Sequence, residues 1–163
     1  MRKIIVALMV LCLLLAGCAE KTESKMDSYG NIWNDPLTLA AGEFKPLLDL
    51  TPEAAHTIEL TVLLDELVGD IKLVYVQQDG TETTFWDSQA PAENAELLEK
   101  WQLGSNWLDK VDITEDALLF RLTLEVPPGE GHFAWQAGEE GVSVIPRVLW
   151  TGLYGAGVTT VYA

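Results

Sequence analysis

The clearest pattern in the chain is an alternation of apolar and polar positions between residues 56 and 86. Every second residue of 56–64 is a branched aliphatic one: Ile58, Leu60, Val62 and Leu64. Residues 71–77 repeat the alternation, and residues 81–86 are rich in β-branched and aromatic side chains. An apolar residue at every second position is the period of a strand with one buried face. With 65–70 as a connection and Asp79-Gly80 as a turn, these segments predict an antiparallel meander of three strands.

A second alternation ends at a loop rich in proline and glycine. The apolar face of residues 117–126 consists of Leu118, Phe120, Leu122, Leu124 and Val126. The Pro-Pro-Gly-Glu-Gly sequence at 127–131 predicts a hairpin loop, and residues 132–136 the strand that returns from it. A turn predicted at 138–141 precedes further strands at 142–151 and 158–162.

Other segments predict the remaining elements. The apolar residues of 91–103 recur at helical spacing: Ala92, Ala95, Leu97, Leu98 and Trp101. Pro91 stands where a first helical turn would begin and Gly104 where a helix would end, so we predict one short helix here. Short apolar pieces at 37–39 and 44–50 predict entry or edge strands, and Pro146 indicates an edge or a bulge.

Together these elements predict the fold class. About seven to nine short strands, with turn signals roughly every 8–12 residues, are the expectation for a sandwich. The motif L-x-L-x-V-P-P-G-x-G-x-F at residues 122–133 is similar to a turn common in jelly-roll and immunoglobulin-like domains. We therefore predict an all-β chain whose residues 37–163 form one antiparallel β-sandwich, jelly-roll or immunoglobulin-like, with one short helix.

The N-terminal residues form a short apolar run after two cations. Arg2 and Lys3 precede thirteen uncharged residues, 4–16, which contain no Gly or Pro. A permanent transmembrane helix needs about 20 apolar residues, whereas a secretory signal peptide has a basic start, a short apolar region and small residues before its cleavage site. Leu15-Ala16-Gly17-Cys18 at the end of the run resembles the lipobox of bacterial lipoproteins, L-[AS]-[GA]-C.

The resemblance implies a diacylglyceryl group on the Cys18 thiol, cleavage before Cys18 and acylation, such as palmitoylation, of the new amino terminus. Residues 1–17 are then a cleaved signal peptide, and residues 18–36 are the lipidated Cys and a polar tether whose Tyr29, Ile32 and Trp33 could dock on the domain. The location implied is extracytoplasmic, on the cell membrane. Because Ala19 stands where inner-membrane members of the family carry Asp, it is the outer membrane where the cell has two.

Charge and cysteine usage narrow the partners further. Removal of residues 1–17 leaves 146 of the 163 residues. It takes away two of the ten basic residues and none of the 25 acidic ones, so the formal charge changes from −15 to −17. Such a surface repels nucleic acid and anionic head groups. We predict attachment through the Cys18 lipid, and no nucleic-acid partner. With Cys12 in the signal peptide, Cys18 is the only remaining thiol, so no disulfide forms within the mature chain.

Two groups of residues are candidates for chemistry. The acidic cluster Asp109, Asp112, Glu115 and Asp116 could bind Ca²⁺ through carboxylate oxygens, but it lacks the EF-hand order, and a solvated loop is the favoured interpretation. His56 and His132 each open a predicted strand, and a zinc site would need both of them with carboxylates. We predict no resident cofactor.

Six tryptophans form the other notable group: Trp33, Trp86, Trp101, Trp107, Trp135 and Trp150. Trp135 and Trp150 share faces with apolar neighbours and are interpreted as core residues. Trp33, Trp101 and Trp107 lie in the predicted tether, helix and loop, where exposed rings could stack on sugars. The alternative for each is packing, because Trp brings a large apolar area to a core.

Three functions stay open at this point. The first is a non-catalytic binding or interaction module of the cell envelope, whose ligand is a glycan, a peptide or an envelope protein. The second is an envelope hydrolase that uses an acidic pair, although no spacing selects a pair among the 25 acids. The third is a structural or assembly subunit of an envelope complex. The chain contains no G-x-S-x-G or phosphate-loop motif, so we predict a binding protein and not an enzyme.

Overall fold

The computed structural model describes residues 24–26, 32–34, 36–90, 94–99, 113–151 and 158–161, and its strands form one antiparallel sheet. The strands are β1 (Ser24–Met26), β2 (Ile32–Asn34), β3 (Leu37–Leu39), β4 (Phe44–Leu50), β5 (His56–Gln77), β6 (Glu82–Asp87), β7 (Ala95–Leu97), β8 (Leu118–Val126), β9 (Gly131–Thr151) and β10 (Val158–Val161). The all-β, antiparallel fold class is confirmed. Within the described ranges no helix is long and apolar enough to cross a membrane.

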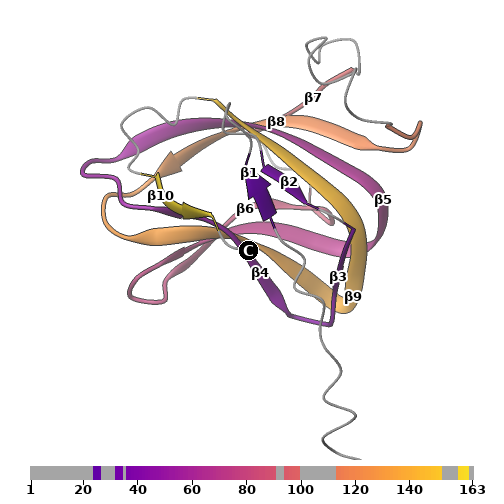
Figure 1. The fold of residues 1–163 in the computed structure, drawn as a ribbon, viewed down its shortest axis with the longest axis horizontal. Coiled ribbons are helices and arrows are strands. Elements are labelled where there is room, and N and C mark those ends of the chain that lie inside the picture. The colour runs from indigo at the N-terminus through magenta and orange to yellow at the C-terminus, as the bar shows by residue number, and fades with distance from the viewer. Residues whose placement is uncertain are drawn as a thin grey trace, which may run out of the picture.

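Two long strands organise the sheet. β5 has 22 residues and β9 has 21, and they pair with each other from Glu59↔Thr151 to Gln77↔Gly131. Register shifts interrupt this ladder at residues 65–71, where both strands bend together at the right of the view in Figure 1. Because the ribbon of β5 and β9 folds over at the bend, each strand contributes one half to each of two layers.

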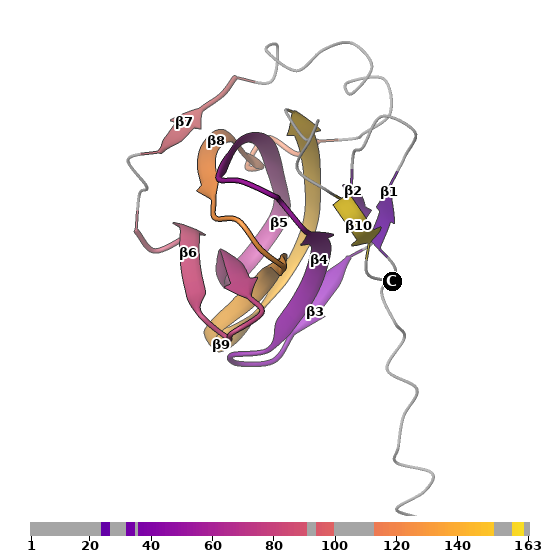
Figure 2. The same cartoon turned by 90° about the vertical axis from the view of Figure 1, so that its left-hand side faces the viewer.

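The remaining strands extend these two layers. In the first layer, residues 56–64 of β5 lie between β8 and the second half of β9, with β7 and β2 further out. In the second layer, residues 71–77 of β5 lie between β6 and the first half of β9, which also pairs with β4. β10 pairs with β4, and β3 with β9 next to the bend. Figure 2 shows these strands curving round a common interior, with β6 at the left and β4 at the right.

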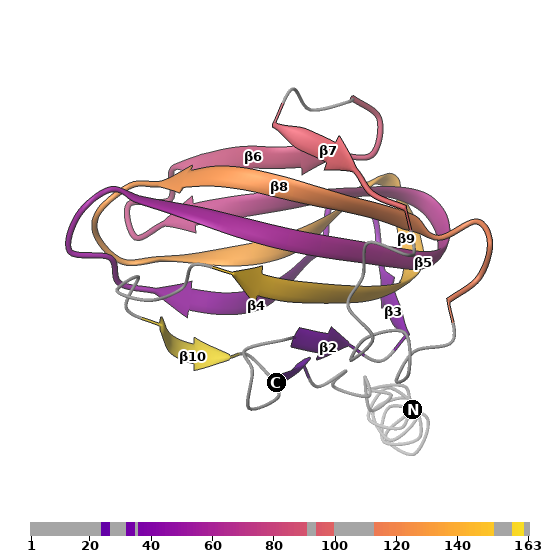
Figure 3. The ribbon, with the colours of Figure 1, turned by 90° about the horizontal axis from the view of Figure 1, so that it is seen from above.

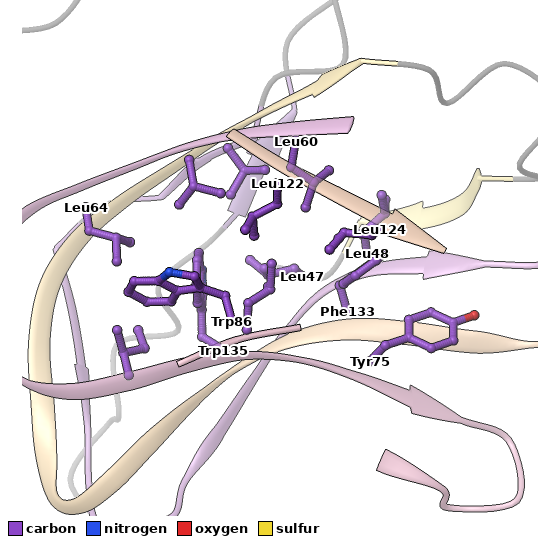
Figure 4. Close-up of a cluster of buried hydrophobic side chains, with 14 of the residues drawn as sticks. Leu47, Leu48, Leu60, Leu64, Tyr75, Trp86, Leu122, Leu124, Phe133 and Trp135 are labelled. Carbon is purple, nitrogen blue, oxygen red and sulfur yellow. The ribbon is translucent and has the colours of Figure 1, made fainter. Parts of the chain in front are cut away.

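Side chains of both layers meet in one apolar core. The predicted inward faces are confirmed: Ile58, Leu60, Val62 and Leu64 have no exposed area, and Phe120, Leu122, Leu124 and Val126 are buried opposite them. Leu118 was expected on this face but is 38% exposed, because it lies at the start of β8. Trp135 is buried as predicted, and Trp86 stacks on Phe120 with ring centroids 4.5 Å apart. Figure 4 shows this cluster.

Asn94 adds hydrogen bonds at the seam between β6 and β8, beside the stacked rings of Trp86 and Phe120. The Asn94 amide donates to the carbonyl oxygens of Phe85 and Thr123, each at 3.4 Å, and the Thr123 N–H donates to the Asn94 carbonyl. Figure 3 shows β6 beside β8, with β7 over this seam. The contact joins the two layers on the side away from β4.

The bend itself depends on close backbone approaches. Gly69 and Gly141 have φ values of +90° and +80°. A Cβ at Gly69 would lie 2.3 Å from the carbonyl oxygen of Gly141, and a Cβ at Gly141 would lie 2.7 Å from that of Leu39. Glycine is required here both for the left-handed backbone and for the space between β5, β9 and β3.

Two segments predicted as turns, 65–70 and 138–141, do not connect separate strands. Residues 65–70 do not join two paired strands, because 56–64 and 71–77 are the two halves of β5. The turn predicted at 138–141 is the matching bend in β9, and the two bends pair as Val68↔Ser143 and Gly69↔Val142. A bulge and a turn carry the same local signal of glycine and acidic residues, so the sequence pattern does not separate them.

The loop at 127–131 is not a hairpin. β5 lies between β8 and β9 in the sheet, and the loop carries the chain from the first layer, where Val126 pairs with His56, to the second, where Gly131 pairs with Gln77. The turn at Asp79-Gly80 is confirmed, because β5 and β6 pair across it and the Gly80 N–H donates to the Gln77 carbonyl at 2.9 Å.

The helix predicted for 91–103 is wrong where the structure describes it. Residues 95–97 are strand β7, which pairs with residues 120–122 of β8. A free edge of β8 offers backbone partners to this segment, and such tertiary pairing outweighs helical periodicity in a short stretch. Part of the predicted tether contacts the domain, as was expected for Ile32 and Trp33: residues 24–26 and 32–34 form β1 and β2, and β2 pairs with β9. The sheet therefore begins before residue 37.

Candidate functional site

A cleft of about 650 Å³ lies at one end of the second layer. It lies where β4 and β5 end and β9 begins, at the left of the view in Figure 1 and opposite the bend. Its lining residues are Asp49, Leu50, Thr51, Val76, Gln77, Gln78, Gly80, Glu130, Gly131 and His132. This size is typical of small-molecule sites, which range over about 300–1,000 Å³.

The connections around the cleft are tied to one another. The Gln78 side-chain amide donates to Glu130 Oε2 at 3.0 Å, and the Gln78 backbone N–H donates to the Glu130 carbonyl at 3.0 Å. The Gly129 N–H donates to the Pro52 carbonyl at 2.9 Å. These bonds join the turn after β5, the connection before β9 and the segment after β4, so the three walls hold a fixed relative position.

The register of the second layer explains which side chains gather here. His132 of β9 is paired with Asp49 of β4 on one side and with Val76 of β5 on the other. Cross-strand partners share one face of a sheet, with Cβ atoms about 4.5–5.5 Å apart. A carboxylate and an imidazole therefore lie side by side on adjacent strands, and both are half-buried.

A buried tyrosine lies directly beneath one lining residue. Tyr75 has no exposed area, and its Oη has no hydrogen-bond partner among the described residues. A Cβ on Gly131 would lie 2.4 Å from this oxygen, so the hydroxyl sits against the backbone at the start of β9. The Tyr75 ring packs on Phe133 with centroids 5.0 Å apart, and Figure 4 shows its hydroxyl pointing away from the rest of the cluster. Burial raises the pKa of Tyr75 above its ordinary value.

Two of the polar residues that line the cleft are carboxylates. Its ionisable lining residues are Asp49, Glu130 and His132, and the lining includes no Lys or Arg. Carboxylates accept hydrogen bonds, whereas the Gln77 and Gln78 amides and the Thr51 hydroxyl can both donate and accept. The lining therefore combines carboxylates and an imidazole with neutral groups that can donate and accept hydrogen bonds.

A second polar cluster lies at the bend. Asp65 is only 2% exposed and accepts hydrogen bonds from the Glu66 N–H, the Thr114 N–H and the Thr114 hydroxyl. Burial lowers the pKa of the nearby Arg147 guanidinium, and the negative charge of Asp65 opposes this shift. Because Asp65 is enclosed and bonded to Thr114, this cluster positions the segment before β8.

The structure locates only part of the residues singled out in the sequence. Leu15, Ala16, Gly17 and Cys18 lie outside the described residues, as do Trp101, Trp107, Asp109 and Asp112. Trp33 lies in β2, but its side chain is not described. Glu115 and Asp116 are exposed in the turn before β8, and no group of three or more metal-ligating side chains occurs in the described ranges.

The two histidines lie in different layers. His56 opens β5 in the first layer, opposite Val126, whereas His132 is in the second layer beside Asp49. The structure thus does not pair them as a zinc site would require. The cleft was not predicted from the sequence, because its residues come from segments far apart in the chain. The sequence feature that could have indicated the cleft is the set of polar residues at strand ends, such as Thr51 and Gln77–Gln78. An analysis of hydrophobic periodicity does not distinguish such residues from ordinary loop residues.

Known proteins supply no further guide to this site. Comparisons with protein-family models, with curated proteins and with solved structures gave no match to the chain.

Proposed function

We propose that the chain is a lipid-anchored protein of the bacterial cell envelope whose β-sandwich is a non-catalytic binding module. The observation that carries this proposal is the Leu15-Ala16-Gly17-Cys18 sequence directly after an uncharged apolar run. A single acyl chain binds a bilayer only marginally, whereas two or three chains hold a protein stably. Diacylglyceryl on the Cys18 thiol, with an acyl group on its amine, would give such an anchor.

The strong negative charge fits this mode of attachment. A mature formal charge of −17 opposes adhesion to anionic lipid head groups, so the lipid would be the sole means of holding the domain at the membrane. The implied location is the outer face of the cell membrane, or the outer membrane of a cell that has two.

The cleft at the end of the second layer supports the binding role. It is concave, its walls are joined by the hydrogen bonds of Gln78 and Gly129, and it presents donors and acceptors from three segments. Walls that are held in place before a ligand arrives reduce the entropy lost on binding. A glycan or an envelope protein is the class of ligand we propose.

Substitution of Cys18 by Ser in the full-length chain tests the anchor. The variant should leave the membrane fraction, or should remain unprocessed with its signal peptide attached. Cys12→Ser is the matched control, because it removes the other thiol and should leave both processing and membrane attachment intact. A Cys18→Ser chain that is cleaved and still sediments with membranes would contradict the proposal, as would a mature Cys18 whose mass shows no lipid.

A further inference from the structure

We propose that the edge of the sandwich formed by β1, β2 and β10 faces the membrane surface at close range, so that the module works at the bilayer and not at the end of a long tether. The inference rests on the proposed lipid anchor at Cys18 and adds to it the orientation and the reach of the domain. The observation that carries it is the early start of the sheet. β1 begins at Ser24 and pairs with β2, and β2 pairs in turn with β9.

The position of Ser24 limits how far the domain can lie from its anchor. Six residue steps separate Cys18 from Ser24, and an extended chain covers at most about 3.6 Å in each step, so the first strand lies within about 22 Å of the lipidated residue. A connection from Cys18 to Leu37, the start of the predicted domain, has 19 steps and could span about 68 Å. The pairing of β1 and β2 therefore removes about two thirds of that reach.

The strand order determines which side of the domain is near the anchor. The first layer runs from β1 through β2, β9, β5 and β8 to β7, so β1 and β7 are its opposite edges. In the second layer β10 pairs with β4 and β6 pairs with β5, so β10 and β6 are the opposite edges. β10 contacts β1, and Figure 2 shows β1, β2 and β10 together on one side and β6 and β7 on the other. An anchor that leads into β1 therefore turns β1, β2 and β10 toward the membrane.

The charges of the two edges agree with this orientation. β1, β2 and β10 contain one Lys and no Asp or Glu, whereas β6 and β7 contain Glu82, Asp87 and Glu96 and no Lys or Arg. Carboxylates occur next to β1 and β2 in the chain, but none occurs within these strands. Because salt screens exposed charges over about 8–10 Å, the edge nearer to the lipid head groups dominates the interaction with them. The edge of β1, β2 and β10 brings fewer carboxylates there.

The cleft lies beside the same edge. Two of its lining residues, Asp49 and Leu50, belong to β4 and pair directly with β10. Neighbouring strands are about 4.8 Å apart, so one wall of the cleft is a single strand spacing from β10. A ligand in the cleft would therefore be bound close to the bilayer. The module is suited to a partner that lies at the membrane surface.

Two labelled positions make the orientation measurable. Cys12 is removed with the signal peptide and the Cys18 thiol carries the lipid, so one introduced cysteine would be the only free thiol of the mature chain. Ala163→Cys labels the C-terminus, two residues after the end of β10. Leu97→Cys labels β7, where the Leu97 side chain is 78% exposed.

Energy transfer from each label to dye-labelled lipid head groups tests the proposal. The processed protein is extracted in a nonionic detergent and inserted into preformed phosphatidylcholine vesicles. Transfer from Ala163→Cys should be at least about twofold more efficient than transfer from Leu97→Cys, because β1 and β7 are separated by five strand spacings of about 4.8 Å.

The length of the connection is tested by insertion. A flexible Gly-Ser segment of about 12 residues, placed directly before Ser24, adds roughly 20 Å of average reach and should lower the transfer from Ala163→Cys about twofold. The matched control is the same segment placed between Asp79 and Gly80, in the exposed turn after β5. Exposed turns tolerate insertions, so the control should leave the transfer unchanged.

The outcomes separate this inference from the anchor itself. Equal transfer from the two labels, stronger transfer from Leu97→Cys, or equal effects of the two insertions would overturn the orientation and leave the anchor in place. Flotation of the vesicles is measured first, and a chain without lipid on Cys18 would not float with them. That result would overturn the anchor, and the orientation with it, before any transfer is recorded.

Discussion

The two ends of the second layer are built in opposite ways. At the bend, the backbones of β5, β9 and β3 are in such close contact that Gly69 and Gly141 leave no space for a Cβ. At the cleft end, Gly80 and Gly129 also have positive φ values, but nothing lies within 4 Å of a Cβ built on either of them. The positive-φ glycines are required for packing between backbones at the bend, whereas at the cleft end Gly80 and Gly129 serve turn geometry and the close contact there is that of Gly131 with the Tyr75 side chain.

Buried polar groups at the two ends also differ in their hydrogen bonding. Asp65 at the bend is enclosed and receives three hydrogen bonds, whereas Tyr75 at the cleft end is enclosed and has no partner in the described residues. Arg147 Nη1 at the bend also has no partner in the described residues, so the contrast lies between Asp65, whose hydrogen bonds tie the bend to the segment before β8, and Tyr75, whose hydroxyl ties no segments together. From this contrast we infer that the buried carboxylate at the bend maintains the fold.

The largest expected effect is that of a side chain at the bend. Gly69→Ala should lower the free energy of unfolding by about 4 kcal/mol, because it adds a main-chain clash with Gly141 to the strain of a positive φ. Gly80 also has a positive φ, but a Cβ there would meet no other atom, so Gly80→Ala should lower the free energy of unfolding by only about 1 kcal/mol. Urea titration followed by tryptophan fluorescence measures both, and equal losses would remove the distinction between the two ends.

An intermediate effect is expected at the buried carboxylate. Asp65→Ala should lower the free energy of unfolding by about 2–3 kcal/mol, because it leaves the Thr114 donors unpaired and the half-buried Arg147 without this counter-charge. Asp116→Ala is the control, since Asp116 is exposed in the turn before β8. If the two variants unfold at the same urea concentration, the polar cluster at the bend contributes nothing to the fold.

The difference between the two ends also explains what the sequence could predict. The buried faces of β5 and β8 were predicted correctly, because a period of two is set by neighbouring residues alone. The two bends were predicted as turns, because local glycine and acidic residues do not reveal that Gly69 packs on Gly141. The pairing partner of a strand depends on distant residues, and a single sequence carries no local signal for it.

The candidate site was less accessible to sequence reasoning for a related reason. Asp49 and His132 are cross-strand partners on β4 and β9, which are more than 80 residues apart in the chain. His132 occupies only a variable position of the motif at 122–133, Asp49 belongs to no motif, and each has an ordinary explanation as a residue at a strand end. The lipobox, in contrast, is contiguous, so it can be recognised from the sequence without knowledge of the fold. It stays a prediction that membrane fractionation must test.

The smallest expected effect has the opposite sign and tests the cleft end directly. Tyr75→Phe should raise the free energy of unfolding by about 1 kcal/mol, because it removes a buried hydroxyl that lacks a partner and keeps the ring packed on Phe133.

Burial raises the pKa of Tyr75 in the folded chain, so the folded chain holds this proton more tightly than the unfolded one. The contribution of this proton to stability is therefore complete below the ordinary pKa of about 10 and is lost as the pH rises toward the folded-state pKa. The phenylalanine variant should lose less stability between pH 9 and about 11 than the native chain. Phe133→Leu, which should be destabilising, controls for a general tolerance of core changes. If Tyr75→Phe destabilises the chain as well, the hydroxyl has a partner within the fold, and the contrast between the hydrogen-bonded Asp65 and the unpartnered Tyr75 does not hold.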